Sequence, residues 1–345
     1  LDKKTPLLRS MEAIERQALR VVRLLGEEDA QRILAMTGAE QEYFLVDKSQ
    51  LAHRLDLALC GRTLFGAKPP KGQEMEDHYY GNIKDRIMNF MRAVDDELWR
   101  LGVPAKTEHN EAAPAQHELA PVYASVNIAT DQNQLTMETL KKVALRQDLV
   151  CLLHEKPFAK VNGSGKHNNW SLNLDGHKSI FDQGKTPESN LRFLLFLTAV
   201  IWAVDEYADL LRVSVASAGN DQRLGGYEAP PAVISIFLGD QLTDLLTEIE
   251  TGGKSTIREG GNLKLGVTTL PNLPKDTSDR NRTSPFAFTG KKFEFRMVGS
   301  SMSIADCNVM INTIVAETLS RMAERLESAA DINEECRMII RDVMR

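Results

Sequence analysis

Apolar residues recur at intervals of three and four in several stretches of the chain, which is the spacing of an amphipathic helix. At Thr5-Pro6 a capping hydroxyl precedes a proline at the first helical position, and Gly26 supplies the stop. The same capping signal recurs at 186–188. We predict helices over residues 6–25, 76–101, 136–155, 186–211 and 232–250, and again after Ile304.

Shorter stretches alternate between apolar and polar residues, which is the pattern of a strand with one buried face. Predicted strands cover residues 40–47, 125–129, 170–174, 263–270 and 292–298, and a long loop covers 276–285. Helices and strands are interspersed, without an internal repeat. The pattern therefore predicts an α+β fold in which helices pack outside strands that carry polar inner residues.

The composition is that of an ordinary soluble globular enzyme, since 42% of the 345 residues are apolar and 26% are charged. A net charge of −6 argues against a general nucleic-acid binder, which would carry a basic surplus. The longest apolar run, residues 193–204, is too short to cross a bilayer, so it predicts a buried helix and no membrane span.

The four cysteines include no CxxC pair and predict reduced thiols in a cytoplasmic protein. They are Cys60, Cys151, Cys307 and Cys336. The chain begins LDKKTPLLRS, without a methionine or a signal-peptide pattern, so we expect a piece of a longer protein.

Two glutamates open one face of the predicted strand 40–47. Glu40 and Glu42 lie on the same face as Phe44 and Val46 because side chains alternate along a strand. Neighbouring carboxylates that are partly buried repel each other unless a cation or a proton intervenes. A solvated strand end is the alternative interpretation.

Two further segments present charged groups. Lys292, Glu294 and Arg296 share one face of strand 292–298, and phenylalanines and a methionine occupy the other. A glycine-rich stretch between two apolar segments carries Arg223 and Glu228. An exposed edge strand and a plain surface loop are the alternatives, whereas a lid would use the glycines to move.

A polar floor is predicted just after the glycine-rich stretch NGSG. His167, Asn169, Ser171 and Asn173 share one face of a strand, and a tryptophan and two leucines share the other. The stretch matches neither the Walker A loop nor the dinucleotide fingerprint. A structural histidine among turn-forming asparagines is the alternative.

The stretch TEHNEAAPAQHELAP places Glu111 and Glu118 seven residues apart with Pro114 between them. A helix would put both carboxylates on one face, but the proline would break it. An unbroken strand would put them on opposite faces. The spacing by itself therefore leaves their arrangement open.

Six acidic or imidazole groups from separate segments could form two cation sites of three ligands each. They are Glu40, Glu42, Glu111, Glu118, His167 and Glu294. Oxygen-rich coordination with open positions suits Mg²⁺ or Mn²⁺ and leaves room for water and nucleotide phosphates. Two such metals, together with arginines, would neutralise a phosphoryl group in transfer.

Several segments resemble glutamine synthetase of the large bacterial type III class in their order and spacing. They include EQEYFLVD, RTLFGAKPPKGQEMEDHYYG, HNEAAPAQHELAP, KPFAKVNGSGKHNNWS and RVSVASAGNDQRLGGYEAPPA. The resemblance covers nearly the whole chain. It implies the catalytic domain of that family, with a curved antiparallel sheet forming a half-barrel active site flanked by helices. Sheet and helices would span about 1–300, and C-terminal helices about 303–345.

The resemblance also implies roles for single residues. The first metal would be held by Glu42, Glu111 and Glu118, and the second by Glu40, His167 and Glu294. Glu111 and Glu118 would lie on adjoining strand segments, with a bend or bulge at Pro114. Asn162 and Gly163 would contact glutamate, and Arg223 and Arg296 would bind its carboxylates. Arg282 would stabilise the transferring phosphate, and Ser171 and Lys292 would contact the nucleotide. Glu228 would close over the site and help to deprotonate ammonium.

The implied reaction joins ammonium to glutamate at the expense of ATP. Mg²⁺ or Mn²⁺ would serve as cofactor, and the family forms stacked rings, usually dodecamers, with active sites between subunits. From the resemblance we also expect that the N-terminal β-grasp domain of the family and the C-terminal extension of its type III members are absent from this chain. A γ-glutamyl ligase acting on another amine or a polyamine, and a non-catalytic binding or structural homologue, are the alternatives.

Overall fold

One open sheet forms the centre of the molecule in the computed structural model, which describes residues 2–184, 186–227, 229–252, 262–263, 273–274 and 284–345. Its ten strands follow the order β2-β3-β1-β6-β12-β11-β8, with β4 and β5 also paired to β1 and β7 to β6. The α+β prediction is confirmed. The sheet is mixed and not purely antiparallel as predicted, because β8 runs parallel to β11.

The strands are β1 (Ile33–Asp47), β2 (Ala105–Asn110), β3 (Gln116–Pro121), β4 (Ala124–Ser125), β5 (Leu149–Leu152), β6 (Gly165–Leu174), β7 (Lys178–Ser179), β8 (Ile236–Phe237), β11 (Phe286–Phe288) and β12 (Phe293–Gly299). A separate pair consists of β9 (Asn262–Leu263) and β10 (Leu273–Pro274). The α-helices are α1 (Lys4–Leu24), α2 (Lys48–His53), α3 (Leu55–Cys60), α4 (Asp85–Arg100), α5 (Val126–Arg146), α6 (Leu191–Glu206), α7 (Ala208–Val213), α8 (Ala218–Arg223), α9 (Asp240–Thr251), α10 (Ala305–Glu327) and α11 (Ile332–Met344). Short 3₁₀ turns cover Glu74–Glu76 and Pro187–Ser189.

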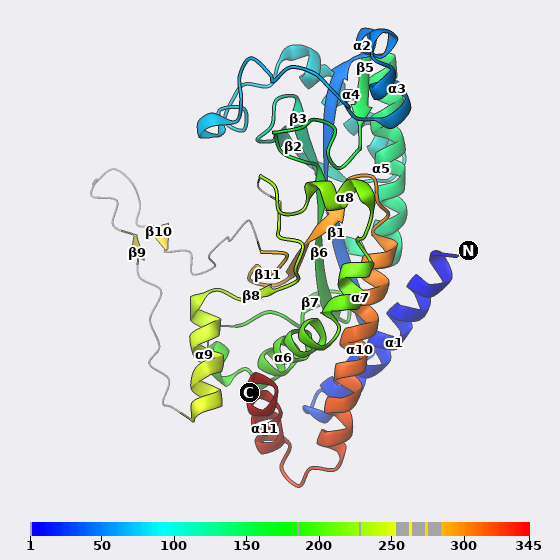
Figure 1. The fold of residues 1–345 in the computed structure, drawn as a ribbon. Coiled ribbons are helices and arrows are strands. Elements are labelled where there is room, and N and C mark those ends of the chain that lie inside the picture. Colours follow the sequence, from blue (N-terminus) through cyan, green and yellow to red (C-terminus); the bar gives the residue numbers. More distant parts are fainter. Residues whose placement is uncertain (1, 185, 228, 253–261, 264–272, 275–283) are drawn as a thin grey trace.

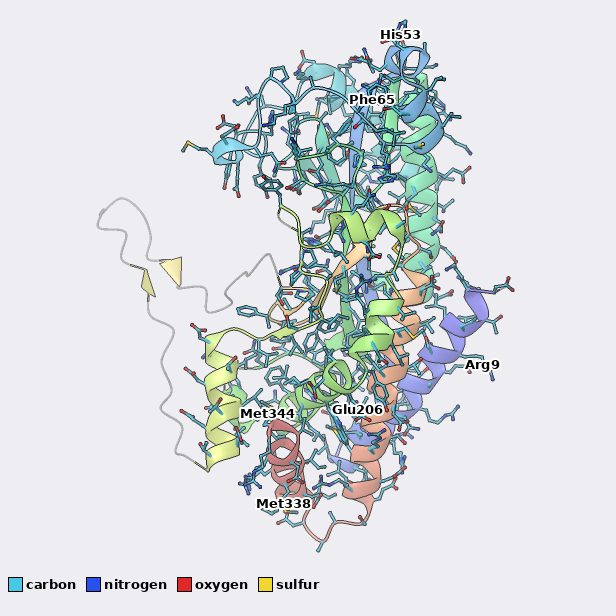
Figure 2. All side chains as sticks on the ribbon, viewed as in Figure 1. Arg9, His53, Phe65, Glu206, Met338 and Met344 are labelled. Atoms are coloured by element: carbon cyan, nitrogen blue, oxygen red, sulfur yellow. The ribbon has the colours of Figure 1, made fainter. Side chains whose placement is uncertain are left out.

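Helices cover the apolar side of the sheet. Figure 1 shows α5, α10 and α1 along one side, with α2, α3 and α4 at one end of the molecule and α6, α9 and α11 at the other. The long segment between α3 and α4, which carries the exposed Phe65, lies at the α2–α4 end (Figure 2). Among the helices that the structure describes, none is long and apolar enough to span a bilayer.

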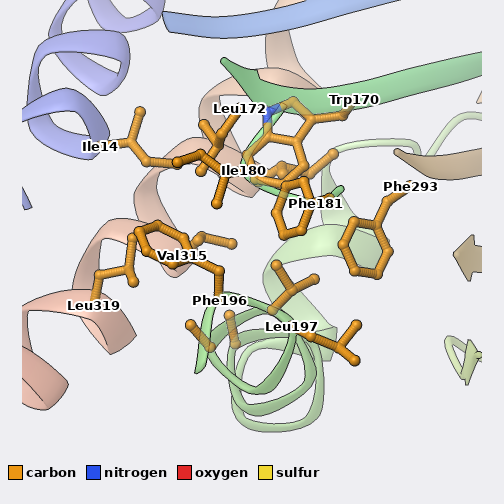
Figure 3. Packing of buried hydrophobic residues seen from close by; sticks show 14 of the residues in the cluster. Ile14, Trp170, Leu172, Ile180, Phe181, Phe196, Leu197, Phe293, Val315 and Leu319 are labelled. Carbon is orange, nitrogen blue, oxygen red and sulfur yellow. The ribbon is translucent and has the colours of Figure 1, made fainter. Parts of the chain in front are cut away.

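Alternation along the strands decides what packs beneath them. Trp170 and Leu172 project from β6 into the main core, where the ring of Phe181 lies 5.8 Å from that of Trp170 and 5.1 Å from that of Phe293 (Figure 3). The indole N–H of Trp170 donates to Asn312 on α10 at 2.9 Å. This layer supports the strand whose opposite face was predicted to be polar.

Several predicted boundaries are wrong because local signals compete. Of the predicted strand 125–129 only Ser125 is in a strand, since α5 begins at Val126 and continues to Arg146. The helix predicted at 136–155 therefore ends earlier, at Arg146, and a left-handed Asp148 (φ 54°) then leads into β5. The helices predicted from 76 and 232 begin only at Asp85 and Asp240. Most of the predicted strand 263–270 and nearly all of the loop 276–285 lie outside the described residues.

A half-buried carboxyl group lies on the reverse face of β2. Burial and the charge of Asp95 raise the pKa of Glu108 to about 9, and Tyr43 donates its hydroxyl hydrogen to Glu108 at 3.0 Å. A glutamate in the unfolded chain titrates near 4.5. Between pH 4.5 and 9, unfolding therefore releases a proton from Glu108. The contribution of Glu108 to stability is full below pH 4.5 and is lost as pH rises toward 9.

We expect Glu108→Gln, which keeps an acceptor for Tyr43, to reduce this pH dependence. Between pH 6 and 8 the free energy of unfolding of the wild type should fall relative to the variant by about 1 kcal/mol per pH unit. Denaturant titrations at several pH values measure this difference, with the exposed Glu12→Gln as control. Parallel curves for the wild type and Glu108→Gln would contradict the assignment.

Candidate active site

The strand registers bring the predicted ligands onto one face of the sheet. Glu42 of β1 pairs with Glu118 of β3, and Glu118 pairs with His109 of β2. On the other side of β1, Glu40 pairs with His167 of β6. Residues directly opposite each other on neighbouring strands point to the same face, with Cβ atoms about 5 Å apart. The pairing thus assembles carboxylates and imidazoles from four strands into one surface.

These side chains line an open pocket of about 350 Å³. All six predicted metal ligands contribute to it, together with Asn162, Gly163, Arg223, Lys292 and Arg296. The other lining residues are Tyr79, His109, Tyr227, Ala229 and Thr289. Segments far apart in the sequence therefore meet at a single concave and predominantly polar surface.

A hairpin turn places Glu111 and Glu118 together. The N–H of Glu111 donates to the carbonyl of Gln116 at 2.9 Å, and Ala115 takes a left-handed conformation (φ 60°) that reverses the chain. Glu111 thus stands opposite Gln116, and Glu118 lies two residues further along β3, so both point to the same face. Pro114 lies in this turn, where its missing N–H removes no sheet hydrogen bond.

The Glu111–Glu118 end of the pocket is a cluster of competing charges. His109 lies between the carboxylates, with Nε2 3.1 Å from Glu118 Oε1 and Nδ1 3.5 Å from Glu111 Oε1. Burial and the charges of Glu42 and Glu118 raise the pKa of Glu111, and burial raises that of Glu118. One ligand atom from each of His109, Glu111 and Glu118 lies within 4.8 Å of the others. A divalent cation fits such a donor set and would relieve the repulsion.

The other end of the pocket combines a carboxylate–imidazole pair with basic groups. His167 Nδ1 lies 3.1 Å from Glu40 Oε2, and Asn169 donates to Glu40 Oε1 at 2.9 Å. Although burial opposes it, the contact with His167 lowers the pKa of Glu40. Glu294 Oε2 accepts bonds from Arg296 at 2.9 and 2.6 Å. Glu40, His167 and Glu294 therefore line the pocket together, with Glu294 engaged by an arginine.

The predicted substrate loop is fixed by hydrogen bonds on both sides. The N–H of Asn162 donates to Gln73 Oε1 at 2.5 Å, and Gln73 Nε2 returns a bond to Asn162 Oδ1 at 3.0 Å. Gln116 Nε2 donates to the Gly163 carbonyl at 2.9 Å, and Gly165 N donates to Glu42 Oε2 at 2.8 Å. The loop is thus tied to the carboxylate floor and to the segment between α3 and α4.

Arg223 is almost wholly buried beside this loop. Its guanidinium donates to the backbone carbonyls of Arg296 and Val298, both at 3.2 Å, and to Asn220 Oδ1 at 3.0 Å. Burial lowers its pKa, which the charges of Glu42 and Glu155 oppose. Arg223 therefore lines the pocket as a rigidly held cation.

Three predicted site residues are not among the described residues that line the pocket. Ser171 shares the polar face of β6, but it is not among the described residues that line the pocket. Glu228 and Arg282 lie outside the described residues. Five of the described lining residues were not predicted from the sequence: Tyr79, His109, Tyr227, Ala229 and Thr289. The strand period would have found His109, two positions before Glu111. Tyr79 comes from a segment predicted as helix, so no local pattern indicated it.

We expect Mg²⁺ or Mn²⁺ to stabilise the folded protein through this pocket. A cation present at 100 times its dissociation constant adds about 2.7 kcal/mol to the free energy of unfolding. The shift should shrink as pH falls because protons compete for the same carboxylates. Thermal melts with and without metal at pH 6 and 7.5 measure it.

Glu118→Gln should abolish most of this stabilisation. A matched control is Asp47→Asn, because Asp47 lies outside this pocket, in a separate surface site where Arg86 balances its charge. An equal metal-induced shift in the wild type and in Glu118→Gln would contradict cation binding in the pocket.

Comparisons with known proteins agree with the geometry. The family model described as "Glutamine synthetase, catalytic domain" matches residues 15–234. A relative from Dictyostelium discoideum, named "Type-3 glutamine synthetase", is 53% identical over 94% of this chain and 44% of its own length. A "Glutamine synthetase" from Butyrivibrio fibrisolvens is 58% identical over 84% of this chain and 41% of its own length. The chain thus spans less than half the length of these relatives.

The fold is also similar to solved structures. A Plasmodium falciparum glutamine synthetase matches with a TM-score of 0.61 at 15% identity, over 92% of this chain and 56% of that one. At this level of identity the likeness describes the fold alone.

Proposed function

This chain belongs to the glutamine synthetase family, as its motifs predicted, and we propose that it is the catalytic part of an enzyme that joins ammonium to L-glutamate. ATP phosphorylates the γ-carboxylate, ammonia displaces the phosphate from γ-glutamyl phosphate, and glutamine, ADP and phosphate leave. One observation carries the proposal: all six predicted metal ligands and four predicted glutamate-binding residues line the same pocket. The cellular role would be cytoplasmic nitrogen assimilation.

Each end of the pocket would hold one of the two metal ions. Glu42, Glu111 and Glu118 would hold one divalent cation, and Glu40, His167 and Glu294 another. When bound, Mg²⁺ or Mn²⁺ supplies charge neutralisation for the phosphate groups of ATP. The carboxylates of the chain would hold these cations, and Asn169 donates an amide hydrogen bond that positions Glu40.

The basic and amide groups would bind the substrates. Arg223 and Arg296 provide planar guanidinium groups suited to the carboxylates of glutamate, and Asn162 and Gly163 provide polar backbone and amide groups beside them. Lys292 donates to Asn169 and lines the pocket, where it would contact the nucleotide. Glu228 would close over the acyl phosphate and exclude water, which would otherwise hydrolyse it. Ser171 and Arg282 complete the proposed nucleotide and phosphate contacts.

We further propose that the intact protein is a homo-oligomer of stacked rings, with active sites formed between subunits. One catalytic domain would cover residues 1–345, and additional domains of the same polypeptide would complete the ammonium site. Size measurement of the intact gene product by light scattering tests the assembly.

Phosphate release from ATP by the intact gene product tests the function. Release in the presence of Mg²⁺ should require both glutamate and ammonium, and glutamine should accumulate in equal amount. Release that needs glutamate and a polyamine, but not ammonium, would instead establish a γ-glutamyl ligase for another amine. No release with any amine would indicate a binding protein that retains the metal ligands.

A further inference from the structure

Beneath the substrate loop lies a buried carboxylate that is outside the pocket lining. Glu155 follows β5 and is only 3% exposed. Its Oε1 accepts hydrogen bonds from the backbone N–H of Ser301, at 3.0 Å, and from the hydroxyl of Ser301. Its backbone carbonyl accepts a bond from the N–H of Ser164 at 2.8 Å. Glu155 therefore ties the substrate loop to the turn that follows β12.

Three glycines from different segments close around this residue. A Cβ atom at Gly163 would lie 2.6 Å from the Glu155 carbonyl oxygen. A Cβ at Gly219, in α8, would lie 2.6 Å from Oε2, and one at Gly299, at the end of β12, 2.6 Å from Oε1. Non-bonded carbon and oxygen atoms do not approach this closely, so the absence of side chains at these glycines lets the three segments meet at Glu155.

The same three segments hold Arg223. A Cβ at Gly163 would lie 2.4 Å from Arg223 Cγ, and one at Gly165 2.6 Å from Nη1, so the loop lies directly against the arginine. Arg223 itself belongs to α8, and its guanidinium donates to carbonyls of β12. A change in the spacing between loop, α8 and β12 would therefore displace Arg223.

We propose that Glu155 is a positioning residue for glutamate binding, which sets the distance between the substrate loop, α8 and β12. It acts through Ser301, Ser164 and the three glycines and touches no substrate. The inference rests on the proposed function, which assigns Asn162, Gly163 and Arg223 to glutamate. The proposed nucleotide residues Ser171 and Lys292 lie outside this junction, so the effect should be specific for glutamate.

Steady-state kinetics of the intact gene product tests this role. Glu155→Ala leaves the Ser301 N–H without its acceptor and should raise KM for glutamate about tenfold or more, with KM for ATP changed less than about twofold. Glu155→Gln keeps an acceptor oxygen at the same length and should restore most of the affinity. Glu12→Ala, on the exposed face of α1, is the control.

Gly219→Ala is a second variant, which should displace the Glu155 carboxylate without replacing Glu155 itself. Its position in α8 favours alanine, but the new Cβ would push on Glu155 Oε2 without entering the pocket. We expect a glutamate-specific rise in KM in the wild-type background and no further rise in Glu155→Ala, because the displaced group is then missing. This variant decides the question if Glu155→Ala does not fold.

Three results would overturn the inference. They are equal changes in KM for glutamate and ATP, a loss of thermal stability without a change in KM for glutamate, and additive effects of Gly219→Ala and Glu155→Ala. A wild type without glutamate- and ammonium-dependent phosphate release would refute the proposed function itself. A wild type with normal turnover and variants that match it would refute only the role of Glu155.

Discussion

Replacing Glu111 with glutamine is expected to lower glutamate- and ammonium-dependent phosphate release about 100-fold or more, because it removes a proposed ligand at the most crowded point of the pocket. The carboxylate lies within reach of Glu118 and His109, where burial and like charge make an ionised group costly unless a cation is bound. The amide keeps the size of the side chain but loses the charge that attracts the metal. The fold should therefore remain while turnover is lost.

Two measurements separate a lost ligand from a damaged fold. Mn²⁺ binding, followed by electron paramagnetic resonance, should weaken in Glu111→Gln, and the melting temperature without metal should stay equal to or rise above that of the wild type. The rise would follow from removing one of several repelling carboxylates. Glu12→Gln, at an exposed position of α1, serves as the matched control. Unchanged Mn²⁺ affinity in Glu111→Gln would remove this residue from the metal site.

The second large effect is expected beneath the pocket, from Trp170→Ala. Trp170 is fully buried on the apolar face of β6, and its loss leaves a cavity beside Phe181 and Phe293. It also leaves Asn312 without the indole donor. Substitutions of this kind cost about 3–5 kcal/mol of unfolding free energy. Urea denaturation should show this loss or a protein that does not fold at all.

Trp99→Ala is the matched control, because Trp99 is 57% exposed on α4 and should cost about 1 kcal/mol or less. Trp170→Phe should be intermediate, since it keeps an aromatic ring but not the hydrogen bond to Asn312. A similar loss of unfolding free energy in Trp170→Ala and Trp99→Ala would contradict the expectation that the apolar core under β6 supports the polar residues of the pocket.

The two faces of β1, β6 and β12 could be predicted from the sequence. Glu40 with Glu42, His167 with Asn169, and the Lys292–Arg296 face were assigned to the polar side by alternation alone, and they line or adjoin the pocket. The apolar partners of these residues, such as Trp170, are in the core as expected. Motif order was equally informative, because it predicted the family that the comparisons confirm.

Helix boundaries were predicted less well, and the reason is physical. Val126 and its neighbours alternate in a way that fits a strand, yet α5 runs through them because its buried residues recur along one helical face. Propensity indicates neither the end of α5 at Arg146 nor the left-handed backbone of Asp148, which precedes β5. Short-range patterns therefore identified the kind of element more reliably than its ends.

The sequence by itself determined which groups each strand offers, because a period of two is a local property of the backbone. Only the tertiary structure decided which of them meet. The hairpin at Ala115 turns Glu111 and Glu118 to one face, cross-strand register sets Glu42 beside Glu118, and His109 enters between the carboxylates. Register and turn geometry depend on contacts between residues distant in sequence. The position of Glu155 beneath the pocket has the same origin, since segments from three other parts of the chain enclose it.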